Sequence, residues 1–153
     1  MQIKGLVDED FINYKVPSMF IAFPICRGFK CGKELCQNSP LALSPNIEID
    51  AKTIINRYLK NPITKAIVLG GLEPFDTYID LLDFIKAFRK VSTDEIVIYT
   101  GYTEKELRIE CAELREYAPI IVKFGRYIPN EKSHYDEVLG VELASDNQYA
   151  VKL

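Results

Sequence analysis

The sequence predicts an α/β fold with a mostly parallel sheet, and two observations lead to that prediction. Short apolar runs rich in β-branched residues alternate along the chain with helical segments of about 10–15 residues. Glycines or polar residues follow several of these runs directly, as expected where a strand passes into a helix. Such alternation is typical of βαβ units, in which right-handed crossovers place the helices over the sheet.

The expected strands are the most apolar segments of the chain. The central ones are short runs rich in β-branched residues. We expect strands at Met19–Phe23, Lys65–Leu69, Glu95–Tyr99 and Pro119–Val122, and a less regular last one at Gln148–Lys152.

The expected helices carry apolar residues at helical spacing and residues that cap a helix N-terminus. Asp50 is a candidate N-cap for a segment in which Ile54 and Tyr58 share one face. Thr103 is followed at the third position by Glu106, the pattern of a capping box. We expect helices at Asp50–Lys60, Asp76–Phe88 and Glu104–Tyr117.

Composition and charge exclude several classes of protein. The chain has 153 residues, which fits one domain spanning residues 1–153, and its net charge is −3 with a pI of about 5.3. The basic surface that a nucleic-acid-binding protein needs is therefore not expected. No apolar run approaches the roughly 18 residues of a membrane span, and the acidic N-terminus is unlike a signal peptide. We expect a cytoplasmic protein in a reducing compartment.

Three of the four cysteines lie in one loop after the first expected strand. Cys26, Cys31 and Cys36 are each separated from the next by four residues. Thiolates bind iron–sulfur clusters and soft metals, and three of them would leave one iron of a four-iron cluster open for chemistry. The alternatives are a zinc site completed by Cys111 or His134, and plain thiols.

The segment GGLEP, Gly70–Pro74, follows the second expected strand. Gly70 and Gly71 would let the backbone come close to a ligand, and Glu73 offers an acceptor for an ammonium group. By itself the segment is also compatible with a plain turn, in which Pro74 opens the next helix.

The turn YTGY places Thr100, Gly101 and Tyr102 at the end of the next strand. Its glycine permits close approach and its aromatic rings could line a pocket, although a tight turn with packed tyrosines is the alternative. Ligands of parallel sheets bind beyond the carboxyl ends of the strands, so we expect this turn, the glycine pair and the cysteine loop on one edge. Further candidates to face the pocket are Arg126, Asn147 and Gln148.

Taken in order, these motifs resemble the radical S-adenosylmethionine (SAM) superfamily. They are most similar to its small members, the anaerobic ribonucleoside-triphosphate reductase-activating proteins, and a related 4Fe–4S single-cluster domain protein is also compatible with them. The cysteine loop resembles the family's cluster loop, GGLEP its Gly-Gly-Glu/Asp-Pro motif, and IVIYTGYTEKEL its strand and TGY turn. KFGRYIP is similar to a segment that usually reads Asp-Gly-Arg-Phe-Ile-Pro, and SDNQ to a terminal Ser-Ser-Asn-Gln.

Several positions depart from the family pattern. Cys-x4-Cys-x4-Cys replaces the usual Cys-x3-Cys-x2-Cys. Leu35 stands where an aromatic residue usually packs near adenine, and Phe29 could take its place. Leu72 separates the glycine pair from Glu73, and Phe124 replaces the usual Asp before Gly-Arg.

The resemblance implies a partial (βα) barrel of radical SAM type and a radical SAM oxidoreductase of the glycyl-radical-activating type. The implied metal ligands, for a [4Fe–4S] cluster, are Cys26, Cys31 and Cys36. The implied SAM-binding residues are Gly70, Gly71, Glu73, Phe29, Thr100, Gly101 and Tyr102. Reductive cleavage of SAM would give a 5′-deoxyadenosyl radical that generates a glycyl radical on a partner such as anaerobic ribonucleotide reductase, with flavodoxin or ferredoxin as the electron donor.

Two other functions stay open at this point. One is an electron-transfer module that binds a 4Fe–4S cluster without SAM chemistry, and the other is a zinc-binding structural protein.

Overall fold

The computed structural model describes residues 1–27, 36 and 38–153. Its elements, with two short 3₁₀ helices named η, are β1 (Gln2–Ile3), β2 (Gly5–Asp10), β3 (Ser18–Phe23), α1 (Ser39–Leu43), β4 (Ile47–Glu48), α2 (Ala51–Lys60), β5 (Ala66–Gly71), η1 (Pro74–Thr77), α3 (Tyr78–Arg89), β6 (Glu95–Tyr99), α4 (Arg108–Leu114), η2 (Arg115–Tyr117), β7 (Ile120–Phe124), β8 (His134–Asp136), β9 (Val141–Leu143) and β10 (Tyr149–Lys152).

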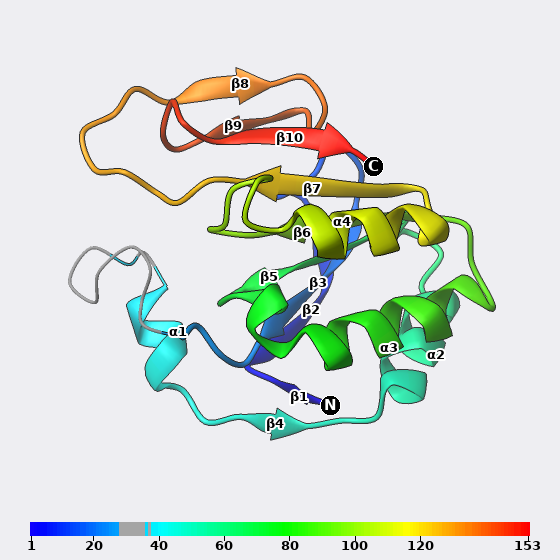
Figure 1. Cartoon of the computed structure of the whole chain (residues 1–153). Coiled ribbons are helices and arrows are strands. Elements are labelled where there is room, and N and C mark those ends of the chain that lie inside the picture. Colours follow the sequence, from blue (N-terminus) through cyan, green and yellow to red (C-terminus); the bar gives the residue numbers. More distant parts are fainter. Residues whose placement is uncertain (28–35, 37) are drawn as a thin grey trace.

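The central sheet has the strand order β10-β7-β6-β5-β3-β2 (Figure 1). β3, β5, β6 and β7 pair in parallel, while β2 and β10 join the two edges as antiparallel strands. The parallel register places Ile21 beside Leu69, and Leu69 beside Ile98. The predicted α/β class and the parallel strands are confirmed, and the partial barrel stays a prediction.

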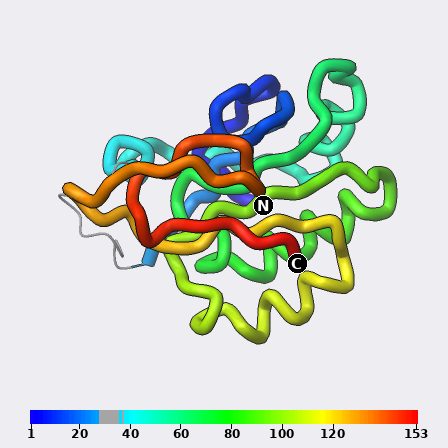
Figure 2. Tube along the Cα trace, turned by 90° about the horizontal axis from the view of Figure 1, so that it is seen from above, coloured from blue at the N-terminus to red at the C-terminus, as the bar shows by residue number. Residues whose placement is uncertain are grey.

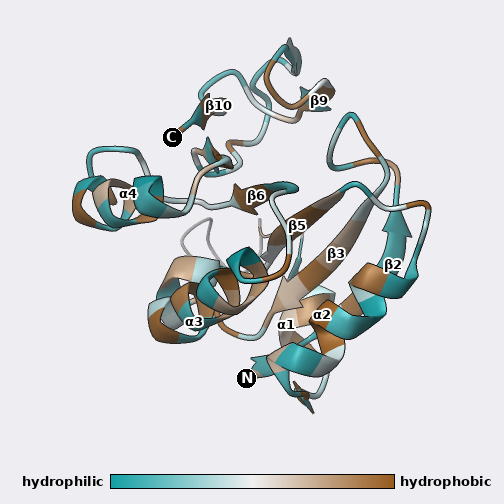
Figure 3. Ribbon diagram, turned by 90° about the vertical axis from the view of Figure 1, so that its right-hand side faces the viewer, coloured by the Kyte–Doolittle hydropathy of each residue, from teal (hydrophilic) through white to brown (hydrophobic). Residues whose placement is uncertain are grey.

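One face of the sheet is covered by helices. Ile21 of β3 and Ile98 of β6 belong to an apolar core that also contains Tyr58 of α2, Phe84 of α3 and Leu114 of α4, all of them buried. Figure 3 shows α2, α3 and α4 together on one side of the strands. Side chains alternate between the two faces along each strand, and those on this face form the larger of the two apolar clusters.

The other face is covered by the C-terminal part of the chain and by the segment between β2 and β3. Val68 and Val97 pack there with Tyr14 and Leu139. Lys15 N donates to Leu139 O at 2.9 Å, which fixes the two covering segments to each other. Figure 2 shows the orange and red C-terminal segments crossing the molecule on the side seen from above.

The predicted helix at Glu104–Tyr117 begins later than expected. The capping box forms, since Glu106 Oε2 accepts from Thr103 N at 2.8 Å and Thr103 Oγ1 accepts from Glu106 N at 3.3 Å. Glu106 N and Leu107 N both donate to Thr103 O, so this segment closes a tight turn before α4 starts at Arg108.

The other two helices lie close to their predicted bounds. Asp50 occupies the N-cap of α2, and its backbone carbonyl accepts from Thr53 N at 3.0 Å. The helix predicted at Asp76–Phe88 is divided, because Pro74 opens η1 and α3 follows from Tyr78. Where residues 26–46 were expected to form one long loop, the described part contains α1.

Several antiparallel strands were not predicted. β2 has the acidic sequence GLVDED and pairs with β3 along the sheet edge, and β8 and β9 are three-residue strands that pair with each other. Their side chains are largely exposed or half-buried, so they lack the apolar runs that mark the parallel strands.

In the described part of the chain, no helix has the length and apolar character needed to cross a membrane.

Candidate functional site

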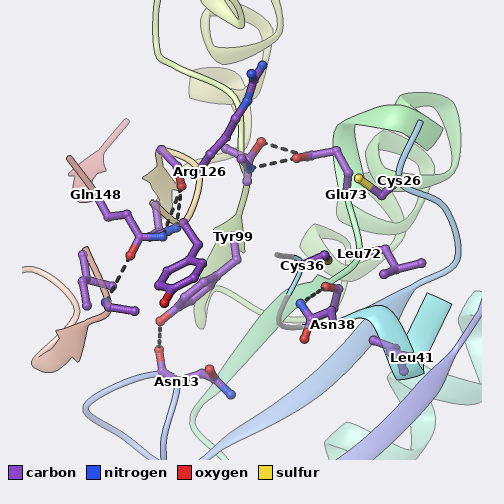
Figure 4. Close-up of a pocket in the computed structure, with 18 of the residues that line it drawn as sticks. Asn13, Cys26, Cys36, Asn38, Leu41, Leu72, Glu73, Tyr99, Arg126 and Gln148 are labelled. Atoms are coloured by element: carbon purple, nitrogen blue, oxygen red, sulfur yellow. Dashed lines mark hydrogen bonds between the residues drawn. The ribbon is translucent and has the colours of Figure 1, made fainter. Parts of the chain in front are cut away.

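A cavity of about 450 Å³ lies beyond the carboxyl ends of the parallel strands (Figure 4). Such a volume is ordinary for a small-molecule site. The cavity is lined by Ile12, Asn13, Phe20, Cys26, Cys36, Asn38, Leu41, Gly71, Leu72, Glu73, Tyr99, Thr100, Gly101, Lys123, Gly125, Arg126, Tyr127, Val141, Glu142, Leu143, Ala144 and Gln148. Cys26 and Cys36 of the cysteine loop, Gly71 of the glycine pair, and Thr100 and Gly101 of the YTGY turn are among these residues, so the described parts of the three segments meet at one edge of the sheet.

Two of the predicted cysteine ligands are described, and both line the cavity. Cys26 follows β3 and Cys36 precedes α1, and each is half-buried. Ser39 donates to Cys36 O from its backbone N at 3.1 Å and from its hydroxyl at 2.7 Å. Cys31 lies outside the described residues, as do Phe29 and Leu35.

The two proposed fourth ligands of a zinc site lie elsewhere. Cys111 is buried in α4 within the helix-covered core, and burial raises the pKa of its thiol to about 11. His134 lies in β8, and neither residue lines the cavity that holds Cys26 and Cys36. No group of three or more histidine, cysteine or acidic side chains that could hold a metal is found among the described residues, which include only two of the three loop cysteines.

Glu73 joins the two predicted turns. Its side chain is buried, and Oε1 accepts from Thr100 Oγ1 at 2.8 Å and from Phe75 N at 3.3 Å. Oε2 accepts from Gly101 N at 2.8 Å. The carboxylate thus holds the YTGY turn against the end of β5, a structural contact that the sequence did not predict.

The two glycines of GGLEP differ in their surroundings. Gly71 lines the cavity with φ +82°, and a Cβ there would lie 2.7 Å from Ala22 Cβ. Only glycine fits this combination of left-handed backbone and close packing. Gly70 is absent from the lining and packs against Phe20 and Tyr99, so its role is to let the strands approach.

Asn38 and Ile25 connect the cysteine segment to the GGLEP turn. Asn38 Nδ2 donates to Gly71 O at 2.5 Å, and Glu73 N donates to Ile25 O at 2.8 Å. Both ends of the cysteine loop are therefore hydrogen-bonded to the turn that carries Glu73.

Tyr102 supports the site from outside the cavity. Its hydroxyl donates to Asp76 Oδ1 at 2.7 Å, and its backbone carbonyl accepts from Gly125 N at 3.0 Å. These bonds tie the turn after β6 to η1 and to the end of β7.

Tyr99, an aromatic of the YTGY turn, lines the cavity, and Lys123 lines it without having been predicted as a site residue. Lys123 is a buried cation in an otherwise apolar strand, and its Nζ donates to Gly125 O at 2.8 Å. The Tyr99 hydroxyl donates to Asn13 O at 2.6 Å. Burial is the largest cause of a raised pKa at Tyr99, followed by the charges of Asp10 and Asp136. The Tyr99 hydroxyl in the cavity wall is therefore protonated at neutral pH.

The SDNQ and GRY segments are hydrogen-bonded to each other. Gln148 lines the cavity; its Oε1 accepts from Ser145 N at 3.2 Å and its Nε2 donates to Gly125 O at 3.3 Å. Asn147 instead donates to Arg126 O at 2.9 Å and lines a neighbouring cavity. Arg126 lines both cavities and pairs with Glu106 at 3.5 Å.

The donor set fits an iron–sulfur cluster. Thiolates are the protein ligands of such clusters, and two thiols of one short loop face a cavity whose wall also includes the backbone of Gly71 and Gly101. The fold and the site together define an α/β protein with a thiol-lined cavity at the carboxyl edge of its sheet.

The comparison with protein families identifies the class. The model of the 4Fe-4S single cluster domain family matches residues 27–149, and the chain belongs to that family. The matched region contains Cys31 and Cys36 and begins one residue after Cys26. No curated protein and no solved structure matches the chain. The predicted iron–sulfur protein with a 4Fe–4S cluster is supported at the level of the family.

Proposed function

We propose that this protein is a radical SAM activating enzyme, which uses SAM and a [4Fe–4S] cluster to generate a glycyl radical on a partner protein. The observation that carries the proposal is the meeting of Cys26, Cys36, Gly71 and Glu73 at one cavity in a chain of the 4Fe-4S single cluster domain family. Anaerobic ribonucleotide reductase is the proposed partner, flavodoxin or ferredoxin the proposed electron donor, and the cytoplasm the proposed compartment.

In this proposal Cys26, Cys31 and Cys36 hold the cluster. When both groups are bound, the reduced cluster supplies the electron for cleavage of SAM, which yields a radical able to take a hydrogen atom from a target. The bonds from Asn38 to Gly71 and from Glu73 to Ile25 keep the ends of the cysteine loop beside the GGLEP turn.

The cavity wall next to the thiols would hold SAM. Gly71 lines that wall as a residue without a side chain, so its main chain forms part of the wall. Glu73 keeps Thr100 and Gly101 in place, and this turn forms the adjoining wall. Glu73 is therefore a positioning residue as well as a proposed SAM contact.

Formation of 5′-deoxyadenosine from SAM tests this function. The anaerobically reconstituted protein, reduced with dithionite, is expected to release 5′-deoxyadenosine, and addition of the partner reductase is expected to give a glycyl radical. Cys36→Ala should abolish both products, whereas Cys111→Ala should retain them because Cys111 lies in the helix-covered core. A protein that keeps its cluster but forms no 5′-deoxyadenosine would be an electron-transfer module instead.

A further inference from the structure

Two hydrogen bonds fix the start of the cysteine loop, one on each side of Cys26. Glu73 N donates to Ile25 O at 2.8 Å, one residue before the thiol. Arg27 N donates to Asp76 Oδ2 at 2.5 Å, one residue after it. Figure 4 shows Cys26 and Glu73 on the same side of the cavity. The main chain at Cys26 is therefore held from both directions, and one of the two bonds needs the carboxylate of Asp76.

The carboxylate of Asp76 is itself held by the turn that follows β6. The Tyr102 hydroxyl donates to Asp76 Oδ1 at 2.7 Å, and Asp76 N donates to Glu73 O at 3.1 Å. The two oxygens of one side chain thus accept from two segments, the cysteine loop and the YTGY turn. A path of hydrogen bonds therefore runs from the turn beside the proposed SAM wall to the main chain of a proposed cluster ligand.

We infer that Asp76 is a positioning residue of the cluster site. The inference rests on the proposed function, in which Cys26 is a cluster ligand. Hydrogen-bonded groups behind a metal ligand orient that ligand, and their loss typically weakens metal binding by roughly 10–100-fold. Asp76 fixes Cys26 in this way and also brings a negative charge to the main chain next to the thiol. Because negative charge disfavours the reduced, more negative state of an iron–sulfur cluster, Asp76 lowers the reduction potential.

A redox titration and an iron-release assay test this inference on the full-length protein, loaded with its cluster anaerobically and kept free of SAM. Asp76→Asn removes the charge but allows both bonds, because the amide oxygen can accept from Arg27 N and the amide nitrogen can donate to the Tyr102 hydroxyl oxygen. Asp76→Ala removes the charge and both bonds. Asp83→Asn, at an exposed position of α3, is the matched control for the loss of charge.

We expect Asp76→Asn to raise the reduction potential of the cluster and to release iron to a chelator at close to the wild-type rate. Asp76→Ala should release iron roughly tenfold faster or more. Asp83→Asn should change neither quantity, because water and salt screen an exposed charge. A residue that served the fold alone would change the melting temperature without moving the potential in Asp76→Asn.

An unchanged potential in Asp76→Asn would overturn the inference, as would an equal shift in Asp83→Asn or iron release from Asp76→Ala at the wild-type rate. If Asp76→Ala does not fold, the potential of Asp76→Asn decides alone. Because SAM is absent, these results do not depend on SAM cleavage. A cluster that responds to Asp76 as expected, in a protein that forms no 5′-deoxyadenosine, would contradict only the proposed function.

Discussion

Glu73 is the residue on which the geometry of the cavity wall most depends. Its carboxylate accepts from Phe75 N, Thr100 Oγ1 and Gly101 N, so it connects the end of β5 to the turn after β6. A buried carboxylate held by protein donors is costly to replace, because each donor would lose its partner in a place without water.

Replacing Glu73 with glutamine should damage both stability and SAM binding. In glutamine, an NH2 group would replace one of the two oxygens that accept hydrogen bonds in Glu73, and it would face a protein donor. We therefore expect a loss of roughly 1–3 kcal/mol in the free energy of unfolding. SAM affinity should fall at least tenfold, while the iron content stays unchanged because no thiol is removed. Urea unfolding, a SAM binding titration and an iron assay measure these effects.

The exposed Glu116→Gln is the matched control and should leave all three quantities unchanged. Unchanged SAM affinity in Glu73→Gln would mean that Glu73 serves the fold alone.

At the scale of the elements, the ends of the parallel strands are built by close packing. β5 pairs with β3 so closely at Gly71 that a Cβ would lie 2.7 Å from Ala22 Cβ and 2.8 Å from Ala22 Cα. The φ of Gly71, +82°, adds a backbone conformation that other residues rarely adopt. The end of β5 therefore depends on this glycine.

Gly71→Ala should destabilise the protein strongly. A left-handed backbone costs a non-glycine residue about 1–2 kcal/mol, and overpacking adds about 1–3 kcal/mol. Urea unfolding of Gly71→Ala should therefore show a loss above about 2 kcal/mol. Gly5→Ala, in β2, is the control, since a Cβ there meets nothing within 4 Å. Inside a strand, alanine is also less destabilising than glycine. Equal effects of the two substitutions would contradict this account.

The parallel elements were predictable from sequence, and the antiparallel ones were not. The strands β5, β6 and β7 are mostly apolar and contain several isoleucines and valines, because helices and C-terminal segments bury both of their faces. β2 is half acidic because it lies at an edge, and β8 and β9 are too short to show a period. The delayed start of α4 was not predicted either. The capping box of Thr103 and Glu106 forms a turn, but the regular helix begins only at Arg108.

At the scale of the whole molecule, four buried or half-buried tyrosines join elements that lie far apart in the sequence. The hydroxyl of Tyr58 in α2 donates to Asp94 Oδ2 at 2.6 Å, and that of Tyr78 in α3 donates to Glu113 Oε2 at 2.9 Å. Tyr14 bonds to Glu95, and Tyr99 to Asn13. Burial is the largest cause of a raised pKa at all four tyrosines.

Stability should therefore fall at alkaline pH. The tyrosines have a higher pKa in the folded state than in the unfolded state, so above about pH 10 unfolding releases protons. The stabilisation of the fold by the protonated tyrosines is therefore complete below that pH and is lost as the pH rises. Each such tyrosine contributes a slope of about 1.4 kcal/mol per pH unit in that range. Urea unfolding between pH 8 and 11 measures the slope, and Tyr58→Phe should make it shallower. A flat profile through that range would contradict the raised pKa values.

The candidate site was predictable in its main parts because its motifs follow strands, and parallel strands end on one edge. From the sequence alone, that rule predicts that Cys26, Cys36, Gly71 and Glu73 lie together, as they do at the cavity. Lys123 was not predicted, because a single lysine at the end of a strand is usually a surface residue. Its direction into the cavity follows from the alternation of β7, in which the neighbouring Phe124 belongs to the helix-covered core.

The central claim is that the cysteine loop holds a four-iron cluster with one iron open to SAM. Electron paramagnetic resonance of the anaerobically reconstituted, dithionite-reduced protein, recorded with and without SAM, tests it most directly. We expect a reduced [4Fe–4S] signal that changes when SAM is added, that is absent in Cys36→Ala and that persists in Cys111→Ala. A signal that ignores SAM would contradict the open iron, and a colourless protein that contains zinc and gives no signal would contradict the cluster itself.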